Sequence, residues 1–253
     1  MEEQAVETFA MRLANRAYLY RILHIAFGAE PSEEELEVLG SGQTGEALRF
    51  LAQTDEAARV RIAFDTSEGT REEPAAEALE RAAGLAADLG AKAHDAEAVS
   101  ALKDCYTRLL VVPGPGFVYP WESPYIGQET MIFQESTLDV RARFKAQGYQ
   151  AVLHHHFPED HISMMLDFLA HLSTRAFEAY GDGDDARARK TLKAQVEFIE
   201  AHLGEWVSEF AREVRKKDVL GAYATLADAL SVFLEIDRLF VRGALAEGGA
   251  LAE

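Results

Sequence analysis

Apolar side chains recur every three or four residues along most of this chain, and that spacing places them on one side of an α-helix. In the first segment, for example, Phe9, Leu13, Tyr20, Leu23 and Phe27 align in this way. No segment shows the clear alternation of apolar and polar residues that a half-buried β-strand needs, and no repeat of roughly 20 to 50 residues is visible. The pattern therefore predicts an all-α fold.

Turn-forming and capping residues divide the chain into the helices that we expect. Ser32 and Glu35 match the pattern of a capping box at the start of one helix, and Gly40 would end it. Asp160 is expected to cap a later helix, and the polar run at residues 65–74 predicts a surface loop. The expected helices span residues 7–27, 32–39, 44–51, an alanine-rich stretch up to 89, 95–110, 129–145, 160–180, 186–202 with an extension to 214, and 218–242.

The length of 253 residues is enough for one packed core and does not require two. We predict a single-domain multi-helix bundle over residues 1–243, followed by a flexible C-terminal tail of small residues at 244–253. Asp237 falls on the apolar stripe of the last helix. A carboxylate there must find a buried partner or belong to a site, and the buried partner is the more common case.

The charge of the chain excludes some partners. It has 43 acidic and 25 basic residues, for a formal net charge of −18, which repels nucleic acid and anionic membrane surfaces. Such a surface favours basic peptides. An acidic surface that serves only solubility explains the same composition, so charge alone does not choose a partner.

The sequence also predicts a cytoplasmic protein. Cys105 is the single cysteine, so the chain forms no internal disulfide. The first residues are acidic, and Arg21 and His24 interrupt the apolar stretch that follows, so no export signal is apparent. No run of about 18 apolar residues occurs, and we expect no stable membrane insertion.

Two irregular segments interrupt the helical pattern. Residues 111–127 carry four prolines and three glycines together with Trp121 and Tyr125, and residues 149–161 end in P-E-D-H. Aromatic rings with a few carboxylates could form a groove for a peptide that has both arginines and an apolar stretch. Alternatively, the rings only fix the first segment to the helices.

A metal site is the main alternative from the residues themselves. His154, His155, His156 and His161 lie close to Glu159 and Asp160, but their spacing matches no established ligand motif. Partly packed loop histidines are the simpler interpretation, and a metal-dependent helical enzyme using this cluster is the alternative. Motifs for nucleophilic catalysis or phosphate binding are absent, so we predict no catalysis and no cofactor.

Three blocks of sequence, in this order, resemble one known family. Y-x-x-L-L at residues 106–110 leads to Gly-Pro at 114–115 and to P-W-E-S-P-Y at 120–125. P-E-D-H at 158–161 precedes an amphipathic helix, and F-I-x-x-H-L-x-x-W spans 198–206. The combination resembles the TorD/DmsD/NarJ family of maturation chaperones for molybdenum-containing oxidoreductases, with one extra residue before the Gly-Pro turn.

The resemblance implies a cytoplasmic chaperone that catalyses no reaction. Its partners would be the N-terminal leader, often a twin-arginine leader, and the catalytic subunit of a molybdenum oxidoreductase. The client, the type of leader, the binding of a nucleotide or molybdenum cofactor, and the choice between monomer and dimer stay open. A helical adaptor that binds a folded subunit instead of a leader is a further alternative.

The same resemblance, with the neighbouring carboxylates, predicts the peptide-binding residues. They are Tyr106, Leu109, Leu110, Trp121, Glu122, Ser123, Tyr125, Glu159, Asp160 and His161.

Overall fold

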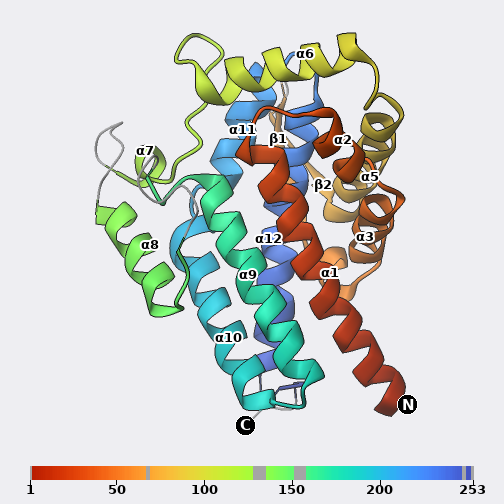
Figure 1. The fold of residues 1–253 in the computed structure, drawn as a ribbon, viewed down its shortest axis with the longest axis vertical. Coiled ribbons are helices and arrows are strands. Elements are labelled where there is room, and N and C mark those ends of the chain that lie inside the picture. The colour runs from red at the N-terminus through yellow and green to blue at the C-terminus, as the bar shows by residue number, and fades with distance from the viewer. Residues whose placement is uncertain (1, 67–68, 128–134, 151–157, 247–248, 252–253) are drawn as a thin grey trace.

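Four long helices form the body of the computed structural model, which describes residues 2–66, 69–127, 135–150, 158–246 and 249–251. They are α1 (Glu2–Gly28), α9 (Ile162–Gly181), α10 (Asp185–Phe198) and α12 (Ala222–Leu245). Figure 1 shows them side by side along the long axis of the molecule. Their apolar stripes face one another, as the sequence periodicity requires. The all-α prediction is confirmed.

Shorter helices cover one end and the sides of this body. In Figure 1, α6 lies across the end of the long helices, and α8 lies on the side next to α10. The shorter helices are α2 (Glu33–Leu39), α3 (Gly42–Ala52), α4 (Asp55–Arg59), α5 (Ala75–Ala91), α6 (Ala96–Tyr106), α7 (Ser123–Ile126), α8 (Glu135–Ala146) and α11 (Val207–Lys217). The capping box at Ser32 and Glu35 is present, with Gly40 at the end of α2.

In the part of the chain that the structure describes, two helices end in a wider π-helical turn. After α6 the chain continues as η1 (Thr107–Val111), and after α10 as η2 (Ile199–Leu203). The N–H of Val112 donates to the carbonyl of Thr107 at 2.9 Å. The two residues are five apart in sequence, whereas the partners in an α-helix are four apart. Both turns fall in the blocks of sequence that carry the family resemblance.

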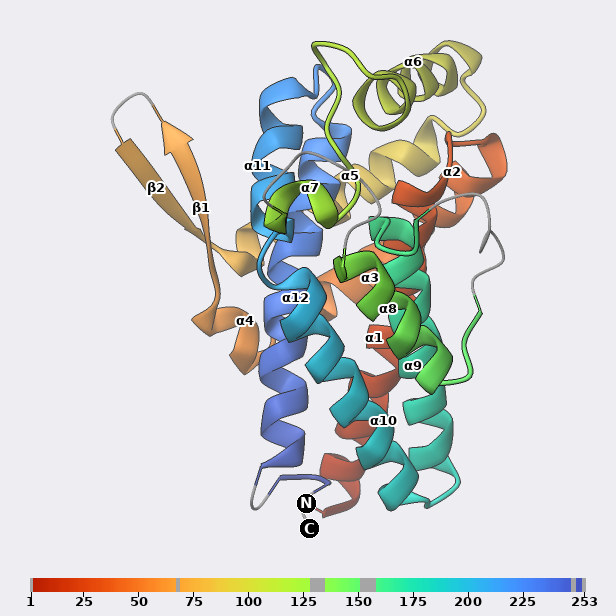
Figure 2. The same cartoon turned by 90° about the vertical axis from the view of Figure 1, so that its left-hand side faces the viewer.

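The polar run at residues 65–74 was expected to be a surface loop. It is instead part of a β-hairpin. β1 (Arg61–Thr66) pairs antiparallel with β2 (Gly69–Pro74), with Arg61 opposite Pro74. Figure 2 shows the hairpin projecting from the side of the helices. Most of β2 faces solvent, so backbone pairing rather than alternating burial defines the strand, and polar residues are tolerated.

The last helix begins later and ends later than predicted. Gly221 adopts φ 77°, and the Asp218 carboxylate accepts the N–H groups of Leu220 and Ala224, both at 2.9 Å, so residues 218–221 form a turn. Helix α12 then continues to Leu245, two residues into the predicted tail, and Leu251 is buried.

Arg16 and Asp237 form a charged pair in the apolar interior. Asp237 of α12 accepts a hydrogen bond from Arg16 Nη2 at 3.0 Å and another from Arg16 Nε, and it accepts the hydroxyl of Tyr20 at 2.6 Å. Burial raises the pKa of Tyr20 well above its usual value. Asp237 therefore has the buried partners that its position on an apolar stripe requires. Within the described residues, no helix has both the length and the apolar character needed to cross a membrane.

Candidate functional site

The two irregular segments come together beside the start of α9. Trp121 and His161 form an isolated antiparallel bridge. The Glu122 N–H donates to the Asp160 carbonyl at 3.1 Å, and the Ile162 N–H donates to the Pro120 carbonyl at 2.8 Å. Segments that are distant in sequence therefore form one unit, as the sequence analysis predicts.

Asp160 fixes this junction from the inside. Its Oδ2 accepts the backbone N–H of Ser123 at 3.0 Å and also the Ser123 hydroxyl, and the side chain is fully buried. The prediction that Asp160 is the N-cap of α9 is therefore wrong. His161 has that position, and its Nδ1 accepts the N–H of Ser163 at 3.1 Å. The carboxylate of Asp160 instead serves the first turn of α7.

The other two predicted carboxylates are also buried and paired within the protein. Glu159 accepts two hydrogen bonds from Arg141 of α8, at 2.6 and 2.8 Å. Glu122 contacts Nδ1 of His202 at 3.1 Å, and Nε2 of the same ring lies 2.9 Å from Asp139. Burial raises the pKa of Glu122. These carboxylates hold the segments in place and do not face an open groove.

A cavity of about 270 Å³ lies at this junction, and we call it the junction pocket. It contains four of the ten predicted residues: Tyr106, Leu110, Trp121 and His161. The other residues that line it are Gly28, Ala29, Glu30, Val111, Ser163 and Met164. The end of α1, the η1 turn and the start of α9 thus form its walls with the bridge between the irregular segments.

Burial favours the uncharged forms of His161 and Tyr106, two titratable residues of the junction pocket. Burial lowers the pKa of His161 to about 4, so its imidazole is neutral near pH 7. Burial raises the pKa of Tyr106, and its hydroxyl donates to the carbonyl of Phe27 at 3.2 Å. The rings of Trp121 and His161 meet edge to face, with centroids 5.2 Å apart. The pocket is therefore an aromatic and apolar cavity.

One charged residue of the pocket was missed by the sequence analysis. Glu30 is exposed at the rim, and its Oε1 accepts a hydrogen bond from the hydroxyl of Thr107 at 2.6 Å. Nothing in the sequence around Glu30 indicates a site, because it lies in a turn between two helices. Only the packing of η1 against this turn brings it to the pocket.

Three further predicted residues, Leu109, Ser123 and Tyr125, do not line the junction pocket but are packed beside it. Leu109 and Ser123 are completely buried, and the ring of Tyr125 stacks on Trp206 with centroids 5.2 Å apart. The Tyr125 hydroxyl donates to the carbonyl of Tyr119 at 3.0 Å. Tyr125 therefore fixes the segment to the helices, which was the alternative interpretation, whereas Trp121 lines the cavity.

The predicted histidine cluster is described only in part. His154, His155 and His156 lie outside the described residues, and Glu159 is bound by Arg141. Within the described residues, no group of three histidine, cysteine or acidic side chains is arranged to hold a metal ion. The metal-dependent alternative thus gains no supporting observation.

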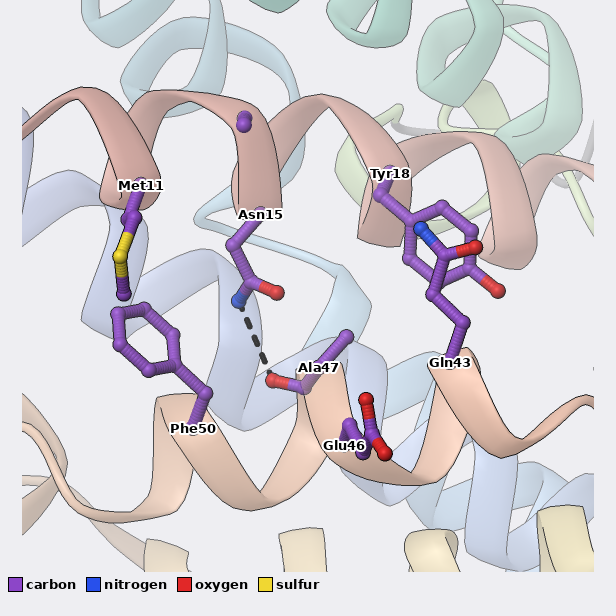
Figure 3. Close-up of a pocket in the computed structure, with 8 residues that line it drawn as sticks. Met11, Asn15, Tyr18, Gln43, Glu46, Ala47 and Phe50 are labelled. Carbon is purple, nitrogen blue, oxygen red and sulfur yellow. Dashed lines mark hydrogen bonds between the residues drawn. The ribbon is translucent and has the colours of Figure 1, made fainter.

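Other cavities are distinct from the predicted residues. A groove of about 290 Å³ runs between α1 and α3, where Met11 and Phe50 lie across from each other and Asn15 donates to the carbonyl of Ala47 at 3.2 Å (Figure 3). A cavity of about 470 Å³ lies between η2, α12 and the start of β1. Neither contains a residue of the predicted peptide-binding set, so the junction pocket is the candidate site.

Comparison with known proteins agrees with the resemblance. The model of the family described as "Nitrate reductase delta subunit" matches residues 71–212, which is more than half of the chain. A chaperone protein TorD from Vibrio parahaemolyticus is 24% identical over 90% of this chain and 95% of its own length. One from Aliivibrio fischeri is 26% identical over the same shares. The alignment with a TorD from Photobacterium profundum, 25% identical, covers 49% of this chain, which thus spans about half (56%) of that relative.

Proposed function

Because this chain belongs to the nitrate reductase delta subunit family, we propose that it is a maturation chaperone for a molybdenum-containing oxidoreductase. We further propose that it binds the N-terminal leader of the client's catalytic subunit in the junction pocket. In this role it acts in the cytoplasm and catalyses no reaction. Relatives that align over 90% of the chain are named chaperones, which supports the proposal.

The observation that carries the choice of site is the meeting of two of the resemblance blocks around one cavity. The first block supplies Tyr106, Leu110 and Trp121, and the second supplies His161. The cavity of about 270 Å³ is at the small end of ligand pockets, which hold roughly 300–1,000 Å³. It therefore fits a few side chains of a peptide rather than a whole leader.

The walls of the junction pocket suit an apolar peptide segment. Leu110, Val111 and Met164 present aliphatic surface, and Val111 is 51% exposed, so it is accessible to a ligand. The indole N–H of Trp121 is buried and has no acceptor among the described residues. A carbonyl of a bound peptide, after a small shift of the ring, would give it one.

Calorimetry with a synthetic leader peptide tests this function, and two adjacent valines provide a matched pair of variants. Val111 lines the pocket, whereas Val112 does not, although it is similarly exposed at 54%. We expect Val111→Asn to weaken the peptide by at least about fivefold, because it places an amide against the apolar segment. Val112→Asn should bind as the wild type does.

Two other outcomes would contradict the proposal. Equal affinity in both variants would move the site away from the junction pocket. Binding of the leaderless catalytic subunit as tightly as the full-length subunit, with no heat from the leader peptide, would favour a helical adaptor.

A further inference from the structure

The rim of the junction pocket has an acidic residue, Glu30, whereas its interior is aromatic and apolar. Among the residues that line the pocket, all of which the structure describes, Glu30 is the one with a carboxylate side chain. The carboxylates of Glu122 and Glu159, in contrast, are buried against His202 and Arg141. Glu30 is therefore the carboxylate that a ligand in the pocket can reach.

The structure also holds Glu30 in position. Its Oε1 accepts the hydroxyl of Thr107 at 2.6 Å, and Thr107 is the first residue of the η1 turn that provides Leu110 and Val111 to the pocket. The carboxylate and the aliphatic wall are thus connected through one turn. No described residue forms an ion pair with Glu30, so it can pair with a cation from outside.

We propose that Glu30 is the specificity-determining residue of the junction pocket, selecting segments in which a basic side chain adjoins the apolar stretch. This inference rests on the function proposed above. The apolar stretch enters against Leu110 and Val111, and the guanidinium of a neighbouring arginine pairs with the carboxylate of Glu30 at the rim. The negative charge of the whole chain, −18, attracts such a peptide in general, but Glu30 fixes where its cation is bound.

The test uses two synthetic peptides that differ at one residue. The first has two arginines followed by a leucine- and alanine-rich stretch, and in the second the arginine next to that stretch is replaced by glutamine. Both are titrated by calorimetry into the wild type, Glu30→Gln and Glu30→Arg. The matched control is Glu34→Gln, which makes the same change of charge at an exposed residue outside the pocket.

We expect the wild type to prefer the arginine peptide by roughly two- to fivefold, the range for a partly exposed ion pair. Glu30→Gln should remove that preference without changing the affinity for the glutamine peptide, and Glu34→Gln should retain it. A third peptide, with glutamate at the same position, should bind best to Glu30→Arg.

The outcomes distinguish failure of the leader-binding function from failure of the role of Glu30. If the wild type binds neither peptide, both the leader-binding function and the role of Glu30 are wrong. If the wild type binds and the arginine preference persists in Glu30→Gln, only the role of Glu30 is wrong. An equal loss of preference in Glu30→Gln and Glu34→Gln would also overturn it, because the effect would then come from overall charge.

Discussion

Arg141 donates two hydrogen bonds, at 2.6 and 2.8 Å, to the buried carboxylate of Glu159 and so connects α8 to the segment before α9. We predict that Arg141→Ala lowers the free energy of unfolding by about 2 kcal/mol, because it leaves a buried carboxylate unpaired. The value is below the range for fully buried pairs, since the Arg141 side chain is 45% exposed. Urea denaturation measures it. Arg143→Ala, which breaks a more exposed pair with Asp139, should cost less than about 1 kcal/mol.

The pair of Arg16 and Asp237 should behave differently, because both side chains are buried. Asp237→Ala should destabilise the protein by about 3–5 kcal/mol, since it leaves the guanidinium without its partner. The double variant Arg16→Met with Asp237→Leu should be more stable than the single variant, because neither residue then leaves a buried charge. Thermal and urea unfolding of the three proteins would decide this. A double variant less stable than Asp237→Ala would contradict the argument.

Stability should depend on pH through His161. Burial lowers the pKa of this imidazole to about 4 in the folded protein, from an ordinary value of 6.5. Between these values the unfolded chain binds more protons than the folded one. The free energy of unfolding therefore increases as pH rises and decreases as pH falls. The slope from this one group is at most about 1.4 kcal/mol per pH unit. His161→Gln should therefore flatten the measured curve of unfolding free energy between pH 4 and 6.5. Superimposable curves for the variant and the wild type would show that His161 titrates normally.

Trp121 and Tyr125 should separate binding from stability. Trp121→Phe keeps an aromatic ring and removes the indole N–H that has no acceptor among the described residues. We expect unchanged or greater stability, with peptide affinity reduced about fivefold by the lost hydrogen bond. Calorimetry and urea unfolding on the same preparation measure both quantities.

Tyr125→Leu should give the opposite result. It removes the stack on Trp206 and the hydrogen bond to the carbonyl of Tyr119, so the free energy of unfolding should fall by about 1–2 kcal/mol. Peptide affinity, measured where the variant is folded, should stay near that of the wild type. A variant that loses affinity without losing stability would show that Tyr125 contacts the peptide.

The sequence predicts the long helices well because each has an apolar stripe that only burial explains. It does not predict the hairpin, because the strand β2 is mostly exposed and its stability comes from backbone pairing with β1. The start of α12 was predicted too early for a similar reason. Asp218 bonds two backbone N–H groups of a turn, and this local arrangement does not alter the apolar periodicity.

The candidate site was predicted in part. The motifs indicate which segments meet, and the bridge between Trp121 and His161 is consistent with that expectation. They do not indicate which side chains face the cavity. Glu159 and Asp160 have the chemistry of a cation-binding site, yet both are buried: Arg141 donates to both oxygens of Glu159, and Ser123 donates to Oδ2 of Asp160. Glu30, from a segment without any motif, reaches the rim through the contact of η1 with the turn after α1.

The π-helical turn η1 shows how the chain accommodates one extra amino acid without displacing the helix before it. Its carbonyl-to-amide bond from Thr107 to Val112 encloses five residues where four would be usual. Because a π-helical turn uses one more residue than an α-helical turn for about the same rotation, deleting one residue here should restore an ordinary α-helical turn. The wall that Leu110 and Val111 contribute to the junction pocket thus stands on a turn one residue longer than an α-helical turn, and a deletion there would change this wall more than the helix before it.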